Sequence, residues 1–387
     1  MRHIRAFTLV ELLIVIAILA ILAAAVVIVI NPGELMAQAK DSERATEIKS
    51  IGKAIDLFIL DNSSTSLGSP NTVYISIPSA TAPNCDAANL SPLPAGWSYR
   101  CASSANLRNI DGTGWIPINF SLIKSGSPLS SLPVDPVNDV SLFKYYSFTI
   151  DSSGFKYKIQ SGIESVRYAA NAGSDGGIDP SSIELGTALN NAPFINGIIG
   201  LWKFEEGSGA STVDSSGFSN ALSWSGNGTH YISGKVGYSG QFNGTDDYAQ
   251  GTLSTSNQFT VTALIRPNQL GREQHIADYT STQFYFGSSN ALGTTSWSTA
   301  AGTTAMTTGN WYHVAVVRNS QGIQLYLNGQ KNGAEGTLGN NPSSPFVIGD
   351  FAPHSGSYKF NGLIDEVTVY KRALSPGEIM ASYLQTK

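Results

Sequence analysis

The sequence predicts an α+β unit, made of one long N-terminal helix and a small antiparallel sheet, followed by an all-β sandwich. The run from Phe7 to Ile30 is apolar except for Thr8 and Glu11, and helical spacing of apolar residues continues beyond it. From Gly197 onward, short runs rich in β-branched and aromatic residues alternate with turn formers. Helix is therefore expected early in the chain and strands later.

The composition is that of a secreted, turn-rich protein. Charged residues make up 13% of the 387 residues and 39 are Gly, which is more typical of β-rich secreted proteins than of cytosolic α/β enzymes. The net charge is −5 and the basic residues are scattered, so we expect no nucleic-acid partner. Arg2, His3 and Arg5 precede the apolar run and hold the leader on the cytoplasmic side of the membrane.

The apolar run is long enough to span a membrane, but it contains an acid. At about 1.5 Å per residue, residues 7–30 make a helix of roughly 36 Å, against a hydrocarbon core of about 30 Å. The carboxylate of Glu11 costs on the order of 3 kcal/mol there, so it needs a partner. Cleavage between Ala6 and Phe7 would create an amine one turn before Glu11, and a neighbouring copy could bring its own amine alongside.

The leader MRHIRA followed by FTLVE resembles the cleavage and methylation motif of type IV pilins and pseudopilins. The resemblance implies that a prepilin peptidase cuts between Ala6 and Phe7, and that Glu11 serves assembly with other pilin subunits by the pilus machinery. It also implies a single-pass precursor in the inner (cytoplasmic) membrane that becomes part of an extracellular surface filament. Ala6 replaces the usual glycine, which implies slower cleavage or a tolerant peptidase. A signal peptide cut after residues 23–25, or a plain signal anchor, leaves Glu11 unexplained.

The helix is expected to change character at Asn31-Pro32-Gly33, where Pro32 removes a backbone donor and predicts a kink or local melt. The following segment, to residue 61, should leave the membrane and pack on a head domain over residues 62–165. Its apolar face is predicted to consist of Ile48, Ile51, Ile55 and Phe58, with Lys40, Asp41, Glu43, Arg44 and other charged residues on other faces.

The head is expected to contain a variable loop and a hairpin around residues 151–154. Cys85 and Cys101 lie in this loop-rich region, and in an oxidising compartment they are most simply a disulfide worth up to about 3 kcal/mol. Residues 166–196 lack apolar periodicity and are rich in turn formers. We interpret them as a linker, with Asp175 and Asp179 more simply solvated than bound to calcium.

The segment from Gly197 to Lys387 resembles the laminin-G-like, concanavalin A-like jelly roll, through motifs such as GLWKFEEGSG, FNGTDDY, WYHVAVVR and GLIDEVTVY. The resemblance implies a structural calcium ion bound by Asp214, Asn220 and Asp365, with turn formation as the alternative role of Asp214 and Asn220. We expect this segment to fold alone. Ser375 as N-cap and Pro376 predict a short closing helix.

Binding is favoured over catalysis for this sandwich. Retaining hydrolases need two carboxyl groups about 5–5.5 Å apart, and no E-x-D-x-x-E pattern occurs. The adjacent acids Glu205–Glu206 and Asp365–Glu366 would point to opposite faces of regular strands. Trp224 and Trp297 lie in turn-rich segments and are candidates to stack against sugars at the surface.

The sequence therefore predicts a surface filament subunit: a pilin-like helix and head (residues 1–6 leader, 7–61 helix, 62–165 head), then a lectin-like sandwich (197–387). The sandwich would bind an extracellular glycan or protein ligand and have no enzymatic activity. The alternatives are a monomeric membrane-anchored binding protein and a cell-bound polysaccharide hydrolase.

Overall fold

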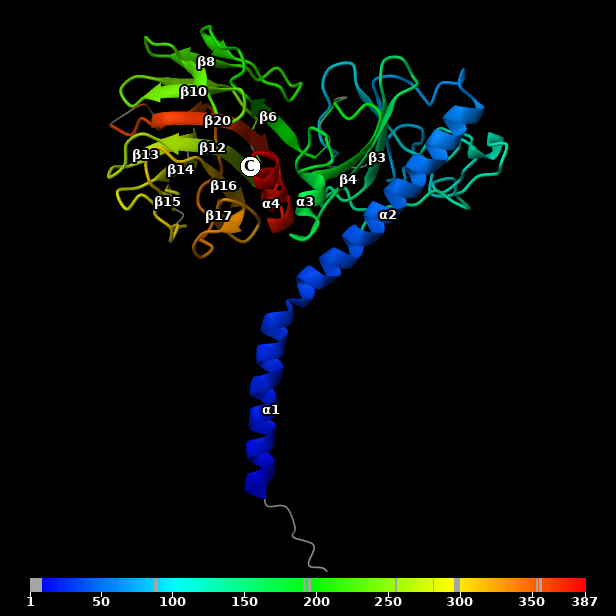
Figure 1. The fold of residues 1–387 in the computed structure, drawn as a ribbon, viewed down its shortest axis with the longest axis horizontal. Helices are drawn as coiled ribbons and strands as arrows, with labels where there is room; N and C mark the ends of the chain where they lie inside the picture. The colour runs from blue at the N-terminus through cyan, green and yellow to red at the C-terminus, as the bar shows by residue number, and fades with distance from the viewer. Residues whose placement is uncertain are drawn as a thin grey trace, which may run out of the picture.

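The computed structural model describes residues 9–86, 90–190, 193, 196–254, 256–280, 282–295, 300–352, 354 and 357–387, with the backbone alone for residues 23–30. Figure 1 shows helix α1 (Leu9–Ile30) projecting from the rest, helix α2 (Pro32–Asp61) against a small sheet, and a β-sandwich beside that sheet. The predicted fold class is confirmed, except that the small sheet is mixed and not wholly antiparallel, because its first two strands pair in parallel.

The two N-terminal helices are separated at Asn31. This residue adopts a left-handed conformation, with φ of 45°, and its side-chain Oδ1 accepts a hydrogen bond from the Glu34 amide at 3.5 Å. Asn tolerates that region better than most residues, and Pro32 suits the first position of the next helix. The predicted kink is confirmed as a change of direction between α1 and α2 (Figure 1).

Helix α2 packs its predicted apolar face on the head. Ile48, Ile51, Ile55 and Phe58 are at most 2% exposed and share a core with Phe148 and Tyr157 of the head sheet. The sheet has the order β2-β1-β3-β4-β5, and a short 3-10 helix, η1 (Phe120–Leu122), adds to the same core. Its strands are β1 (Thr72–Ile75), β2 (Ser98–Arg100), β3 (Tyr146–Ile150), β4 (Tyr157–Gly162) and β5 (Ser182–Gly186). Strands β3 and β4 form the predicted hairpin.

The segment predicted as a linker is instead built into the head. It contains helix α3 (Ala169–Ala172) and strand β5, which pairs antiparallel with β4 along the edge of the sheet. Asp179 is 1% exposed and accepts hydrogen bonds from Ser181 and from Gln160 Nε2, so it is not solvated. The prediction was wrong because Gly, Ser and Asp form hydrogen-bonded turns here, and such turns need no apolar periodicity to be buried.

From Ile198 the chain forms two stacked antiparallel sheets. The eight-stranded sheet consists of β6 (Ile198–Trp202), β9 (Tyr231–Ser233), β10 (Tyr238–Asn243), β12 (Phe259–Pro267), β16 (Tyr312–Arg318), β17 (Ile323–Leu327), β18 (Gln330–Lys331) and β20 (Asn361–Tyr370). The seven-stranded sheet consists of β7 (Ser211–Thr212), β8 (Leu222–Ser225), β11 (Tyr248–Gly251), β13 (Gln274–Tyr279), β14 (Thr282–Phe286), β15 (Leu292–Gly293) and β19 (Phe346–Ile348).

The core of the sandwich lies between these sheets. Trp202 of β6 stacks on Phe346 of β19 with ring centroids 5.3 Å apart, and both side chains are fully buried. Ala315 and Val317 of β16 face the other way and are also buried, within a second cluster that includes Ile379 of the last helix. Strand β16 is therefore covered on both faces, which explains why the sequence is apolar on both.

The last helix, α4 (Pro376–Gln385), covers the outer face of the eight-stranded sheet. The Ser375 hydroxyl accepts the Glu378 amide at 3.3 Å, and the Glu378 carboxylate accepts the Ser375 amide at 2.7 Å, which completes a capping box. The predicted closing helix is confirmed. Figure 1 shows α4 between the sandwich and α3, so the end of the chain contacts the head as well.

Candidate functional site

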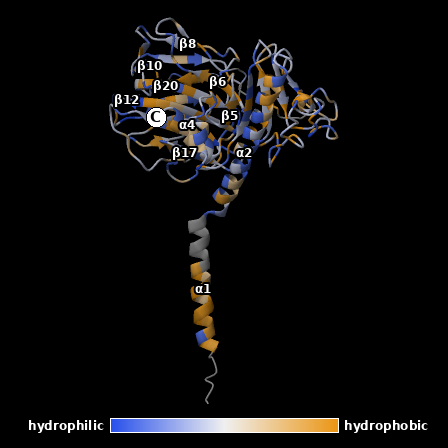
Figure 2. Cartoon of the chain, turned by 45° about the vertical axis from the view of Figure 1, so that its right-hand side comes forward, coloured by the Kyte–Doolittle hydropathy of each residue, from blue (hydrophilic) through white to orange (hydrophobic). Residues whose placement is uncertain are grey.

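The N-terminal helix exposes an apolar surface. All side chains that the structure describes on α1, from Leu9 to Leu22, are exposed, and Figure 2 shows this part as hydrophobic against the mixed surface of α2. Glu11 lies in the first turn. Ala6 and Phe7, the predicted cleavage site, lie outside the described residues. An apolar surface of this extent requires a lipid or protein partner.

Among the residues that the structure describes in full, no helix is both long and apolar enough to cross a membrane. The membrane span predicted from the sequence covers residues 7–30 and so extends beyond those residues at both ends. It stays a prediction.

A buried ion cluster joins α2 to the head loops. Arg44 is fully buried and donates from Nη1 to Asp41 at 2.8 Å, from Nε to Asp135 at 2.7 Å and from Nη2 to Glu164 at 2.6 Å. Burial alone would lower the pKa of Arg44, but these three carboxylates raise it above its usual value. The sequence placed Asp41 and Arg44 on faces other than the apolar one, but it did not reveal their burial. Apart from each other, their partners come from 91 or more residues away along the chain.

A second buried cluster joins the head to the sandwich. Lys144 of the head donates to Glu378 Oε1 of α4 at 3.1 Å, and Arg372 donates from Nη1 to Glu378 Oε2 at 3.0 Å and from Nε to the Asn196 carbonyl at 2.6 Å. All three charged side chains are at least nine-tenths buried. Burial alone would raise the pKa of Glu378, but Arg372 and Lys144 lower it to about 2. We call Lys144, Arg372 and Glu378 the joint cluster. No local sequence pattern marked it.

Two of the predicted calcium ligands lie together. Asp214 Oδ1 accepts the amides of Leu201 and Ser216, and Oδ2 accepts the amide of Asn220, each at 2.9 Å. The Asn220 side-chain amide donates to the Ile199 carbonyl at 2.7 Å. These contacts tie the loop after β7 to strand β6, so the alternative role as turn formers accounts for much of this geometry.

The third predicted ligand lies elsewhere. Asp365 of β20 accepts the amides of Lys235 and Val236, each at 3.2 Å, and its burial raises its pKa to about 7. Within the described part of the chain, no hydrogen bond joins Asp365 to Asp214 or Asn220, and no three or more His, Cys, Asp or Glu residues group around a metal position. Asp214 and Asn220 thus hold one loop, and Asp365 holds another turn. Calcium binding by these three residues stays a prediction.

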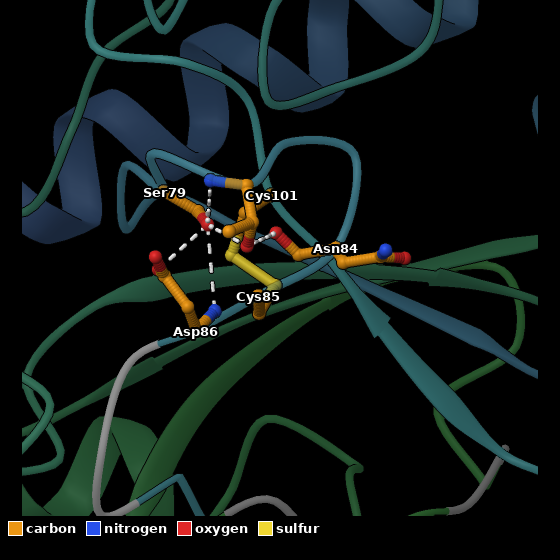
Figure 3. Close-up of a disulfide and its surroundings, with 6 residues drawn as sticks. Ser79, Asn84, Cys85, Asp86 and Cys101 are labelled. Carbon is orange, nitrogen blue, oxygen red and sulfur yellow. Dashed lines mark hydrogen bonds between the residues drawn. A yellow bond between two sulfur atoms is a disulfide. The ribbon is translucent and has the colours of Figure 1, made fainter.

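The disulfide is formed between Cys85 and Cys101, whose Cα atoms are 5.2 Å apart. Figure 3 shows Ser79 next to it, donating to the Asp86 carboxylate at 2.7 Å and accepting the Asp86 amide at 3.3 Å. The Cys101 amide donates to the Pro83 carbonyl at 3.1 Å. The bond thus closes the loop between β1 and β2.

The predicted stacking platform at Trp224 is a core residue instead. Trp224 lies on β8 and is 9% exposed, stacks on His230 at 4.4 Å between ring centroids, and donates from Nε1 to the Tyr231 hydroxyl at 2.9 Å. The surrounding turn formers hid a short strand, in which Leu222 and Trp224 face inward and Ser223 outward. Trp297 lies outside the described residues.

A buried histidine on β13 is held between two acids, a feature that we did not expect from the sequence. His275 is 1% exposed, with Nδ1 at 2.6 Å from Asp278 and Nε2 at 3.0 Å from Glu273, and its ring stacks on Tyr285. Burial alone would lower the pKa of His275, but the two carboxylates raise it above its usual value. The H-x-x-D spacing was the available signal, but it requires a bulged strand to bring the two side chains together.

The first pair of adjacent acids weighed as catalytic candidates, Glu205 and Glu206, has backbone partners. Glu205 accepts the Tyr238 amide at 3.2 Å and Glu206 accepts the Val213 amide at 2.6 Å, in a turn that follows β6. They hold turns in place.

Comparisons with known proteins match the two ends of the chain. Residues 1–27 match the prokaryotic N-terminal methylation motif, and residues 243–380 match the concanavalin A-like lectin/glucanases superfamily. No curated protein matches the chain.

Among the solved structures that are similar to this chain, three illustrate the range. Domain 4 of the GH43 extracellular arabinanase AbnA from Geobacillus stearothermophilus, in complex with arabinotriose, is 23% identical with a TM-score of 0.41, covering 49% of this chain and 98% of that one. Trypanosoma rangeli sialidase in complex with sialic acid is 12% identical with a TM-score of 0.40, covering 62% and 44%. A putative carbohydrate binding protein from Bacteroides ovatus is 21% identical with a TM-score of 0.33, covering 37% and 46%. The chain thus spans less than half of the sialidase.

The methylation motif implies a membrane-anchored precursor that a prepilin peptidase processes. The chain therefore carries a prepilin-type N-terminal methylation motif followed, in its C-terminal half, by a concanavalin A-like domain.

Proposed function

We propose that the protein is a pilin-like subunit of a surface filament whose sandwich binds an extracellular ligand, a glycan or a protein. The observation that carries this proposal is the methylation motif at the start of an apolar helix with uncovered side chains. That helix continues through Asn31 into α2, whose other end is buried in the head. The arrangement offers one helix for polymerisation and a separate globular part for display.

The joint cluster supports display of the sandwich in a fixed orientation. Lys144 belongs to the head and Glu378 to the last helix of the sandwich, and they pair while nearly fully buried. A filament of such subunits would carry each sandwich at a set position and not on a flexible arm.

The first test is the mature N-terminus. Intact-mass and N-terminal sequencing of surface protein should find N-methylated Phe7, and electron microscopy of sheared surface material should find filaments that contain the protein. Retention of Met1 or a cut near Ala25 would refute the processing step. Correct processing without filaments would favour the monomeric membrane-anchored alternative.

Glu11→Ala is expected to leave membrane insertion intact and to reduce filament yield at least tenfold. The carboxylate costs on the order of 3 kcal/mol in the membrane, and we propose that pairing with a neighbour's N-terminal amine offsets this cost. Glu43→Ala, which removes an exposed carboxylate from α2, is the matched control and should assemble normally. Wild-type yield from Glu11→Ala would show that the pairing argument is wrong.

We further propose that the sandwich binds and does not hydrolyse its ligand. This is supported by the backbone partners of Glu205 and Glu206, which leave them serving a turn. Release of reducing sugars from arabinan, xylan or chitin by the purified chain would contradict the proposal.

A further inference from the structure

A cavity of about 230 Å³ lies where the head, the sandwich and the last helix meet. Its floor is the outer face of the eight-stranded sheet, contributed by Thr262 of β12, His313 of β16 and Glu366 of β20. One wall is the C-terminal half of α4, with Ser382, and another is the head segment 177–180. The cavity is thus closed by residues that are more than 100 positions apart in the sequence.

One buried polar atom among the residues that line this cavity has no hydrogen-bond partner in the described part of the chain. His313 is 3% exposed, and its Nε2 lies 3.1 Å from Ser382 Oγ, whereas its Nδ1 has no partner in the described part of the chain. Burial lowers the pKa of His313 to about 4, so the ring is neutral at pH 7. A buried polar atom without a partner is rare in proteins and calls for an explanation, such as a bound molecule.

A charged pair also lines the cavity. Lys203 follows β6 and Glu366 lies on the neighbouring strand β20, close enough for Lys203 to influence the Glu366 carboxyl. Within the described residues, neither the ammonium nor the carboxylate forms a hydrogen bond or ion pair. Their charges cancel, so the cavity as a whole favours a neutral occupant.

The backbone places Glu366 in the cavity at a local cost. Its φ is 48°, a left-handed conformation that is unfavourable for a non-glycine residue. The pairing register shifts here, because Thr262 opposes Thr368 whereas Leu264 opposes Asp365, so β20 has an extra residue in a bulge. Asp365 is fully buried and Glu366 is only partly buried, facing the cavity. Strain of this kind recurs at binding sites.

We propose that this cavity binds one small, neutral, hydroxyl-rich molecule of the size of a single sugar ring, held jointly by the head and the sandwich. A molecule with several hydroxyl groups offers both donors and acceptors, which match the imidazole, the Thr262 hydroxyl, the ammonium and the carboxylate. The volume is below the range of about 300–1,000 Å³ typical of drug-sized ligands. All the residues of the proposed site belong to one chain, so the site does not require filament assembly. It lies on the eight-stranded sheet and is therefore distinct from a ligand site on the seven-stranded sheet.

The test uses the full chain in detergent micelles and four probes: glucose, galactose, N-acetylglucosamine and arabinose at millimolar concentration. Thermal shift and saturation-transfer NMR should detect at least one of them, with an increased melting temperature because a ligand that binds only the folded chain stabilises it. Thr262→Val removes a hydroxyl with little change in volume. This variant and Glu366→Gln should each raise the dissociation constant of the probe, the latter about tenfold.

Tyr248→Ala is the matched control, since Tyr248 lies half-buried on β11 of the opposite sheet. It should leave the affinity unchanged. If no probe binds, the cavity holds water alone and the proposal is overturned. Binding that is lost in Tyr248→Ala but kept in Thr262→Val overturns it too, by placing the ligand on the other sheet. If Glu366→Gln fails to fold, Thr262→Val decides. Filament yield of Thr262→Val should be normal, which separates this result from any failure of the proposed function.

Discussion

Buried charge has different partners in the joint cluster and in the turns of the sandwich that Asp214 and Asp365 hold. In the joint, Glu378 pairs with Arg372 and Lys144, so charges of opposite sign neutralise each other across two units. In the sandwich, Asp214 and Asp365 have backbone amides as partners, and each secures the approach of one loop to one strand. Removing one partner from the joint leaves unpaired buried charges, whereas removing an acid from a turn loses hydrogen bonds alone.

This difference indicates where the two units depend on each other. A fragment starting at Gly197 would lack Lys144 and the Asn196 carbonyl, which partner Glu378 and Arg372 in the whole chain. The expectation that this segment folds alone is therefore weakened by the structure. We expect the head and sandwich to unfold together.

The largest effect is expected from Glu378→Gln. It leaves Arg372 and Lys144 buried without their carboxylate, at a cost of about 3–5 kcal/mol in the free energy of unfolding. Chemical denaturation of the full chain, followed by tryptophan fluorescence, measures this change. Glu335→Gln, on an exposed side chain of the same sandwich, is the control and should change stability by less than about 0.5 kcal/mol. A loss below 1 kcal/mol for Glu378→Gln would show that the joint cluster is not a coupling element.

A smaller effect is expected from calcium. If an ion binds at Asp214 and Asn220, it stabilises the chain by about 2.7 kcal/mol at a hundredfold excess over its dissociation constant, so chelation should lower the melting temperature by several degrees. Asp214→Ala should abolish this sensitivity. Asp365→Ala should retain it, because Asp365 holds a different turn. A melting temperature unaffected by chelator would leave Asp214 as a turn former.

The smallest effect is expected from the pH dependence of His275. Its folded-state pKa is raised above the unfolded value of about 6.5, so its contribution to stability is fully present below that pH. The contribution is lost as the pH rises through the folded-state pKa. His275→Gln should flatten this decline in denaturation measured across neutral and mildly alkaline pH. Tyr285→Phe, which keeps the stacked ring, should preserve it, and an unchanged slope in His275→Gln would contradict the assignment.

Local patterns predicted much of the fold. The apolar face of α2, the break at Asn31 and Pro32, and the capping box of α4 all follow from short-range chemistry. Helix spacing, proline geometry and capping act within a few residues, so they can be recognised in a single chain. The disulfide was predictable because the chain has two cysteines.

Long-range contacts were not predictable in the same way. The burial of Trp224, the incorporation of β5 into the head sheet and the separation of Asp365 from Asp214 depend on which distant strands become neighbours.

The sequence by itself determined that the chain begins with a methylation motif on an apolar helix and ends in a two-sheet sandwich. Only the tertiary structure decided that Lys144 meets Glu378 and that His313, Thr262 and Glu366 share one cavity with the head. The physical reason is that a buried charge or polar atom is defined by its partners. Lys144 and Glu378 lie 234 residues apart along the chain, and His313, Thr262 and Glu366 come from three different strands, so they become adjacent only when the chain folds.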